Sequence, residues 1–172
     1  MTRPMQSVAI VFLLLSTLLL FAGCNGELDE FEDDFDTQFT VPKPEGAVEP
    51  FTKSKRFILD NDPSEAEFVK FKRARLSVQA PAGSDLSFLS RIEIYIEHDS
   101  ELTLVAEAEG FSPGETARAL DIVYRGDLRG FVTDKRVRLT WIVFPTAWGY
   151  AWPDEGVTIQ TDVTFLINAD II

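Results

Sequence analysis

The sequence predicts an all-β protein: an antiparallel β-sandwich of about seven strands, either Ig-like or jelly-roll-like. Three observations support this fold class. Apolar residues recur at every second position through most of the chain after Phe57, turn-forming residues separate these runs, and no stretch has the length and period of a long helix. Strands with one polar face and short connections favour antiparallel pairing, and seven of them most simply form two packed sheets. A barrel is the alternative.

Each expected strand is defined by its own alternating run. The seven runs are Phe57 and Leu59, 68–80, 92–96, 102–108, 120–124, 137–143 and 157–167. In the second run the apolar phase slips from odd-numbered to even-numbered positions after Phe71. This slip predicts a β-bulge near Lys72–Arg73, or a strand that crosses between the sheets.

The N-terminus has the layout of an export signal. A basic residue, Arg3, precedes an almost wholly apolar run from Val8 to Phe21. These 14 residues are fewer than the roughly 20 that a membrane-spanning helix needs. A basic start, a short apolar core and small residues behind it are typical of a secretory signal peptide, so residues 1–23 are expected to be removed.

The end of this run, Leu20-Phe21-Ala22-Gly23-Cys24, resembles the lipobox of bacterial lipoproteins, although Phe21 stands where leucine is usual. The resemblance implies that signal peptidase II cuts before Cys24 and that this thiol carries diacylglycerol. Two or more acyl chains, palmitate among them, would anchor the protein permanently to a membrane. Asn25 follows the cysteine, and the sorting habit of enteric lipoproteins then implies the outer membrane in a Gram-negative host, or otherwise the cell membrane.

Negative charge is concentrated just behind Cys24. The chain has a net charge of −12, and residues 27–50 hold nine of its 28 acids but only one base. Residues 24–50 are therefore expected to be an acidic, proline-containing tether, and 51–172 the sandwich domain. Two interpretations of the acidic segment stay open. It is an extended, solvated spacer, or it docks on its own domain or on a partner, because Phe35, Thr37, Phe39 and Val41 alternate as in a strand.

The expected domain has no cysteine, because Cys24 is the only one in the chain. No disulfide can therefore hold residues 51–172 together, and their apolar core must stabilise them alone. The roughly 120 residues are enough to bury a substantial core. A chain that begins at Phe51 is thus expected to fold by itself.

Two groups of basic residues mark a candidate binding surface on the first two expected strands. They are Lys53, Lys55, Arg56, Lys70, Lys72, Arg73 and Arg75. If the two strands are neighbours, these residues form a basic edge or face. Such charges commonly protect an edge strand from aggregation. They would also suit the acidic tether, or an anionic partner such as a lipopolysaccharide phosphate.

An aromatic loop joins the last two long strands and is a second candidate binding surface. Trp148, Tyr150 and Trp152 have the same parity, so an extended loop would direct all three to one side. Such a row could bind sugar rings, lie in a membrane interface, or cover the open end of the sandwich. Burial as a cap is the commoner outcome for large aromatic residues.

No group of residues predicts catalysis, a metal or a cofactor. The only histidine, His98, stands at an expected turn, and zinc would need several Cys or His ligands. Nucleic acid is an improbable partner for so acidic a chain. The sequence therefore favours a non-enzymatic envelope lipoprotein that binds the membrane through its anchor, and another envelope protein or a glycan through its domain. The alternative is a carbohydrate-binding or glycan-cleaving module with Asp154, Glu155 and Asp162 near the aromatic loop.

Overall fold

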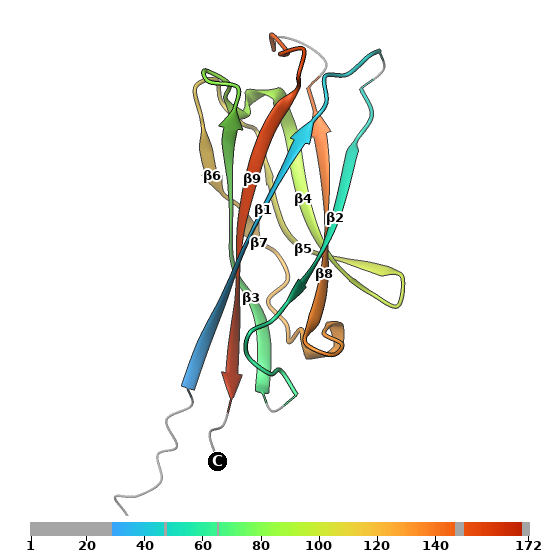
Figure 1. The fold of residues 1–172 in the computed structure, drawn as a ribbon, viewed down its shortest axis with the longest axis vertical. Helices are drawn as coiled ribbons and strands as arrows, with labels where there is room; N and C mark the ends of the chain where they lie inside the picture. The colour runs from blue at the N-terminus through green and yellow to red at the C-terminus, as the bar shows by residue number, and fades with distance from the viewer. Residues whose placement is uncertain (1–28, 47, 65, 147–149, 170–172) are drawn as a thin grey trace, which may run out of the picture.

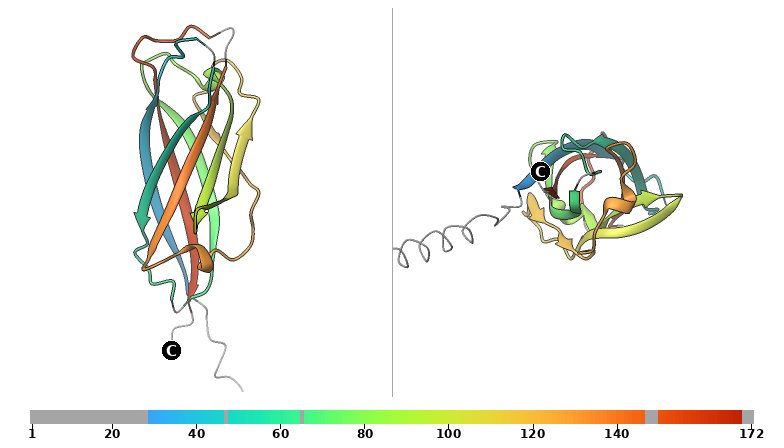
Figure 2. Two further views of the ribbon diagram at one scale, coloured as in Figure 1. Left: turned by 90° about the vertical axis from the view of Figure 1, so that its right-hand side faces the viewer. Right: turned by 90° about the horizontal axis from the view of Figure 1, so that it is seen from below.

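The computed structural model describes residues 29–46, 48–64, 66–146 and 150–169 and shows two antiparallel sheets packed together (Figures 1 and 2). Sheet A has the strand order β1-β9-β3-β6, and sheet B has the order β2-β8-β4-β5-β7. The elements are β1 (Asp29–Val41), β2 (Phe51–Ile58), β3 (Ala66–Ala80), η1 (Leu86–Phe88), β4 (Leu89–His98), β5 (Glu101–Glu109), β6 (Ala117–Ala119), β7 (Asp121–Ile122), η2 (Arg129–Phe131), β8 (Arg136–Pro145) and β9 (Val157–Ala169). The predicted β-sandwich is confirmed.

The core is built from the inward-facing residues of the alternating runs. In β4, Ile92, Ile94 and Ile96 are fully buried. Trp141 of β8 is the largest fully buried side chain, and its ring centroid lies 6.0 Å from that of Phe39 in β1. Burial of one such side chain stabilises a domain by roughly 1.5–3 kcal/mol, so a core of this kind suffices without a disulfide.

Two predicted irregularities of the strands can be compared with the structure. The β3–β9 register shifts between Phe71 and Arg73, which confirms the bulge. The strand expected over 120–124 is reduced to β7 in sheet B, and a second short strand, β6 in sheet A, precedes it. The chain crosses between the sheets at Leu120, whose side chain is buried and whose N–H donates to the carbonyl of Ala74.

Of the two interpretations of the acidic segment, the structure supports docking on its own domain for residues 29–41 and contradicts a solvated spacer there. Residues 29–41 form β1, which pairs with β9 over its whole length, from Asp29 opposite Ala169 to Val41 opposite Val157 (Figure 1). The expected tether is thus corrected for these residues, because they are an edge strand of the sandwich. The described domain begins at Asp29 rather than at Phe51.

The two faces of β1 explain why so acidic a segment joins a sheet. Its inward face places Phe39 and Val41 in the core. Its outward acids face cations on other strands, since Glu32 lies 2.6 Å from Nζ of Lys72 and Asp34 lies 3.5 Å from Arg73. These pairs are exposed, and each contributes only about 0–1 kcal/mol. Apolar burial therefore dominates the attachment of β1.

One acid of β1 points inward. Asp33 is 1% exposed, and its carboxylate accepts hydrogen bonds from the backbone N–H groups of Asp60 and Asn61 and from the side-chain amide of Asn61. A buried carboxylate needs such donors to offset its desolvation. Asp33 therefore ties the β2–β3 loop to β1.

Candidate functional site

The two ends of the sandwich differ in what they carry. Because Asp29 and Ala169 are register partners, the described chain enters and leaves at the same end, which we call the terminal end (Figure 1). The opposite end, which we call the distal end, is formed by the described loop residues 42–46, 48–50, 81–85, 110–116 and 150–156. Both the aromatic loop and a network of polar contacts lie at the distal end.

Two residues of the aromatic loop pack on the core at the distal end. The rings of Tyr150 and Trp152 lie 5.7 Å and 5.2 Å from the ring of Phe88, between centroids. Phe88 belongs to η1 and is fully buried, whereas Tyr150 and Trp152 are half-buried. These two side chains therefore cover one end of the core and keep part of their surface in water.

The mutual orientation of these rings bears on sugar binding. Tyr150 and Trp152 meet edge to face, with 82° between their planes. Two rings at this angle do not present a single flat surface to a sugar. Trp148 lies outside the described residues, so the predicted platform of three rings stays a prediction.

Alanine substitutions at these positions test the capping role. We expect Tyr150→Ala and Trp152→Ala each to lower the free energy of unfolding by about 1–3 kcal/mol, because each ring is only half-buried. Trp141→Ala is the comparison, with an expected loss of about 3–5 kcal/mol for a fully buried aromatic residue. Chemical denaturation of the three variants measures these losses. Wild-type stability of Trp152→Ala would contradict the capping role.

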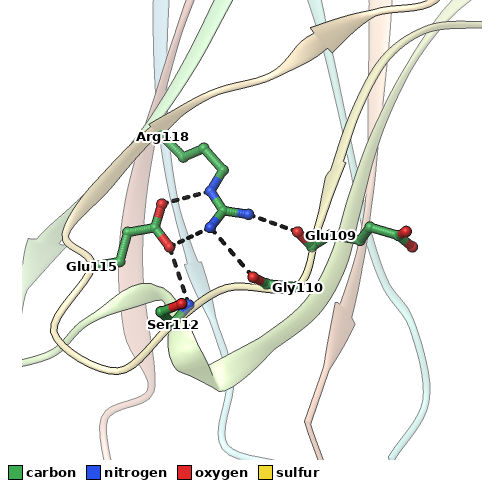
Figure 3. A network of polar contacts seen from close by, with 5 residues as sticks. All are labelled: Glu109, Gly110, Ser112, Glu115 and Arg118. Carbon is green, nitrogen blue, oxygen red and sulfur yellow. Dashed lines mark hydrogen bonds and ion pairs between the residues drawn. The ribbon is translucent and has the colours of Figure 1, made fainter.

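A polar network fixes the loop between β5 and β6 (Figure 3). The Arg118 guanidinium donates two hydrogen bonds to the Glu115 carboxylate and others to the carbonyls of Glu109 and Gly110. Arg118 also lies over the ring of Phe111, 4.6 Å from its centroid. The hydrogen bonds from Arg118, followed by that from the N–H of Ser112, lower the pKa of Glu115 below its usual value.

Asp85 joins this loop to η1. Its carboxylate accepts hydrogen bonds from the Ser87 hydroxyl and N–H, and a third from the N–H of Gly114. Burial opposes ionisation of Asp85, but these three donors outweigh it and lower the pKa of the carboxyl group. The backbone completes the link, because the N–H of Leu86 donates to the carbonyl of Glu115 at 2.7 Å. The distal loops are therefore held to one another by specific contacts.

The two basic groups predicted from the sequence are separated in the structure. Lys53, Lys55 and Arg56 lie on β2 in sheet B, whereas Lys70, Lys72, Arg73 and Arg75 lie on β3 in sheet A. The condition for a single basic edge, that the two strands are neighbours, is thus not met. The acidic edge strand β1 lies between the two groups, and Lys55 donates a hydrogen bond to the carbonyl of Asp36 on that strand.

His98 is the last residue of β4 and is exposed, as predicted. Asp99 and Ser100, which follow it, both have positive φ angles, as in a type I′ hairpin turn. The Nε2 atom of His98 lies 3.2 Å from the Asp99 carboxylate. The His98 ring packs against Phe131. No hydrogen bond joins the imidazole to Ser100 among the described residues.

The acids proposed for a glycan-cleaving site are spread along the molecule. Asp154 lies in the distal loop before β9 and is paired with Lys43 at 2.6 Å, which lowers the pKa of Asp154. Asp162 lies in the middle of β9 on the outer face of sheet A. The strand from Val157 to Asp162 alone spans roughly 17 Å, which exceeds the roughly 5–10 Å between paired glycosidase carboxylates.

The described residues contain no cluster of three or more His, Cys, Asp or Glu side chains arranged to hold a metal ion. Nor do they include a helix that is long and apolar enough to cross a bilayer.

Comparison with known proteins yields only distant structural similarity. Neither the models of known protein families nor the curated proteins include a match to this chain. Among solved structures, a chain of turnip yellow mosaic virus is 6% identical with a TM-score of 0.34, over 84% of this chain and 96% of the viral one. A chain of the empty head of the same virus is 10% identical with a TM-score of 0.29, over 84% of each chain. Values this low carry no inference about function.

Proposed function

We propose that this protein is a lipid-anchored lipoprotein of the bacterial cell envelope, which holds its sandwich against the membrane and presents the distal end for non-catalytic binding. The observation that carries the proposal is the position of Cys24 relative to the fold. Asp29, the first residue of β1, is five positions beyond Cys24 in the sequence and lies at the terminal end. The chain that follows Cys24 in the sequence therefore enters the sandwich at the end opposite to the distal loops.

The short separation makes the proposal geometrically specific. Five extended residues reach at most about 18 Å. A spacer that continued to residue 50 would allow a domain to stand as far as about 90 Å from the membrane. Because β1 is part of the sandwich, lipidation of Cys24 would instead keep the terminal end close to the lipid headgroups. The distal end would then face away from the membrane.

The distal end is suited to a structural or binding role. Its loops are joined by the contacts of Arg118 and Asp85, and the half-buried rings of Tyr150 and Trp152 leave apolar surface accessible. A fixed surface loses little conformational entropy on binding, and aromatic residues contribute strongly to interfaces. The proposed partner is another envelope protein or a glycan.

Spin labels on two serines test both the anchor and the orientation. Lipidation would consume the natural thiol, so Ser64→Cys at the terminal end and Ser112→Cys at the distal end each supply the only free thiol. Both serines are exposed. We expect a nitroxide on residue 64 to be close to paramagnetic probes in the headgroup layer, and one on residue 112 to be beyond their reach. Electron paramagnetic resonance in reconstituted vesicles measures both distances.

Cys24→Ser is the control for the anchor. This variant should leave the membrane fraction and should not be cut by signal peptidase II. Normal processing and membrane association of Cys24→Ser would contradict the lipoprotein assignment. Equal proximity of residues 64 and 112 to the headgroups would contradict the orientation alone.

A further inference from the structure

We infer that a cavity beside β3 binds an amphipathic anion, a phosphate or carboxylate group joined to a hydrocarbon chain. The cavity lies where the chain crosses from sheet A to sheet B, between β3, the segment 120–125 and β9. Its volume of about 530 Å³ is within the range of roughly 300–1,000 Å³ that small-molecule sites occupy. The inference is independent of the lipid anchor and of the distal end.

Half of the lining is apolar. Ile122 of β7 and Leu166 of β9 line the cavity and are half-buried, so part of each side chain is accessible from it. Leu166 is notable because it lies on the outer face of sheet A, where its neighbours along β9 are polar. Contact with a hydrocarbon chain would remove this apolar surface from water, which is favourable.

The rest of the lining is mainly cationic. The charged residues of the lining are three cations, Lys70, Lys72 and Arg125, and a single acid, Asp121. Lys72 is already paired with Glu32 at 2.6 Å. Lys70 lies over the ring of Phe68, with its Nζ atom 4.0 Å from the centroid, and neither Lys70 nor Arg125 has an ion-pair partner among the described residues. These two cations are therefore available to an anionic group.

The excess of cations distinguishes this cavity from three others among the described residues. The cavity between Asp62 and Lys135 has three acids and two cations, and the one around Lys43 has three acids and one cation. The cavity beside His98 has three arginines balanced by three acids. Since the whole chain carries a net charge of −12, a concave surface with surplus positive charge is not a consequence of composition.

The two halves of the lining together define the ligand. Lysine and arginine side chains attract phosphate and carboxylate groups, and arginine offers paired donors to either. The apolar side chains suit a hydrocarbon chain attached to that group. A membrane lipid and a free organic phosphate or fatty acid share this chemistry, whereas inorganic phosphate supplies only the charged half.

Titration calorimetry with three probes tests the inference. The protein is the chain from residue 24 with Cys24→Ser, which has every described strand and no acyl chain of its own. We expect dodecyl phosphate, below its micellar concentration, to bind with a dissociation constant at least about ten-fold lower than that of inorganic phosphate. Dodecyl maltoside, which has the same hydrocarbon chain without charge, should show no saturable binding. Equal affinity for inorganic and dodecyl phosphate would overturn the amphipathic ligand, and equal binding of dodecyl maltoside would overturn the anionic one.

Paired substitutions locate the site. Lys70→Gln combined with Arg125→Gln should raise the dissociation constant of dodecyl phosphate about ten-fold or more. Arg56→Gln combined with Arg136→Gln removes the same charge from exposed positions of sheet B and should leave it unchanged. Ile122→Ser should weaken dodecyl phosphate and leave inorganic phosphate unaffected. Equal effects of the two charge pairs would place the ligand elsewhere and overturn the inference, provided that circular dichroism shows all variants folded.

Discussion

A chain that begins at Phe51 is expected not to form a stable domain, because it lacks β1. This strand pairs with β9 at 13 positions and buries Phe39 and Val41, while Phe31 and Phe35 pack against the core. Each fully buried side chain contributes roughly 1.5–3 kcal/mol, and the total stability of a typical domain is only about 5–15 kcal/mol. Removal of β1 would also leave the backbone groups along one edge of β9 unpaired, because only the other edge is paired with β3.

Thermal melting followed by circular dichroism measures this effect. The chain from Phe51 should show no cooperative transition, whereas a chain from Asn25, which retains β1, should melt like the lipid-free full domain. A peptide of residues 29–41 added to the shorter chain should restore part of the β signal. A cooperative transition of the shorter chain near the temperature of the longer one would contradict the role assigned to β1.

Gly156→Ala is expected to be the most damaging single methyl addition in the described part of the chain. Gly156 is buried just before β9 and has a φ angle of +82°, a conformation that costs other residues about 1–2 kcal/mol. A Cβ atom at this position would also collide with the carbonyl oxygen of Val41 and lie 3.1 Å from Cα of Pro42. Both neighbours are backbone at the end of β1, so the collision can be relieved only by moving that strand. We expect a total loss of about 3 kcal/mol or more.

Gly114→Ala separates the cost of the positive φ angle from the cost of the collision. Gly114 has a nearly identical φ angle of +83°, and a Cβ atom there would meet nothing within 4 Å. Its substitution should therefore cost only the conformational part, about 1–2 kcal/mol. Equilibrium unfolding in urea of both variants measures the difference. Equal losses would show that the contact between Gly156 and β1 does not constrain the fold.

The strands of the sandwich were predictable because each is a local pattern. Buried residues recur at every second position along β4, β8 and β9, as the inward face of a strand requires, and the bulge after Phe71 follows from a change in the apolar alternation of β3. The acidic segment was harder to assign because its concentrated negative charge also suits a solvated spacer. The alternation of Phe35, Thr37, Phe39 and Val41 indicated a strand. Whether these residues join a sheet depended on a partner strand, β9, that lies far along the chain.

The sequence shows which residue types could form the candidate sites, but it does not show which of these residues lie together in space. An aromatic loop is visible in the sequence, yet the contact of Tyr150 and Trp152 with Phe88 joins segments about sixty residues apart. The cationic cavity beside β3 was not predicted as a site, because Arg125 and Leu166 have no local pattern that links them to Lys70. Sequence analysis placed Lys70 and Lys53 in one candidate surface instead, on the condition that the two consecutive strands are neighbours.

The sequence by itself determined the all-β class, most strand positions and the lipobox-like segment ending at Cys24, because periodicity and linear motifs are properties of adjacent residues. Only the tertiary structure decided which strands are neighbours. It paired β1 with β9, so that Thr40 meets Thr158 across 118 positions, and placed β2 and β3 in different sheets. Strand order depends on which edges bury the most apolar surface together, and that is a property of the whole chain. That long-range pairing is also why the sandwich begins at Asp29, only five positions after Cys24 in the sequence.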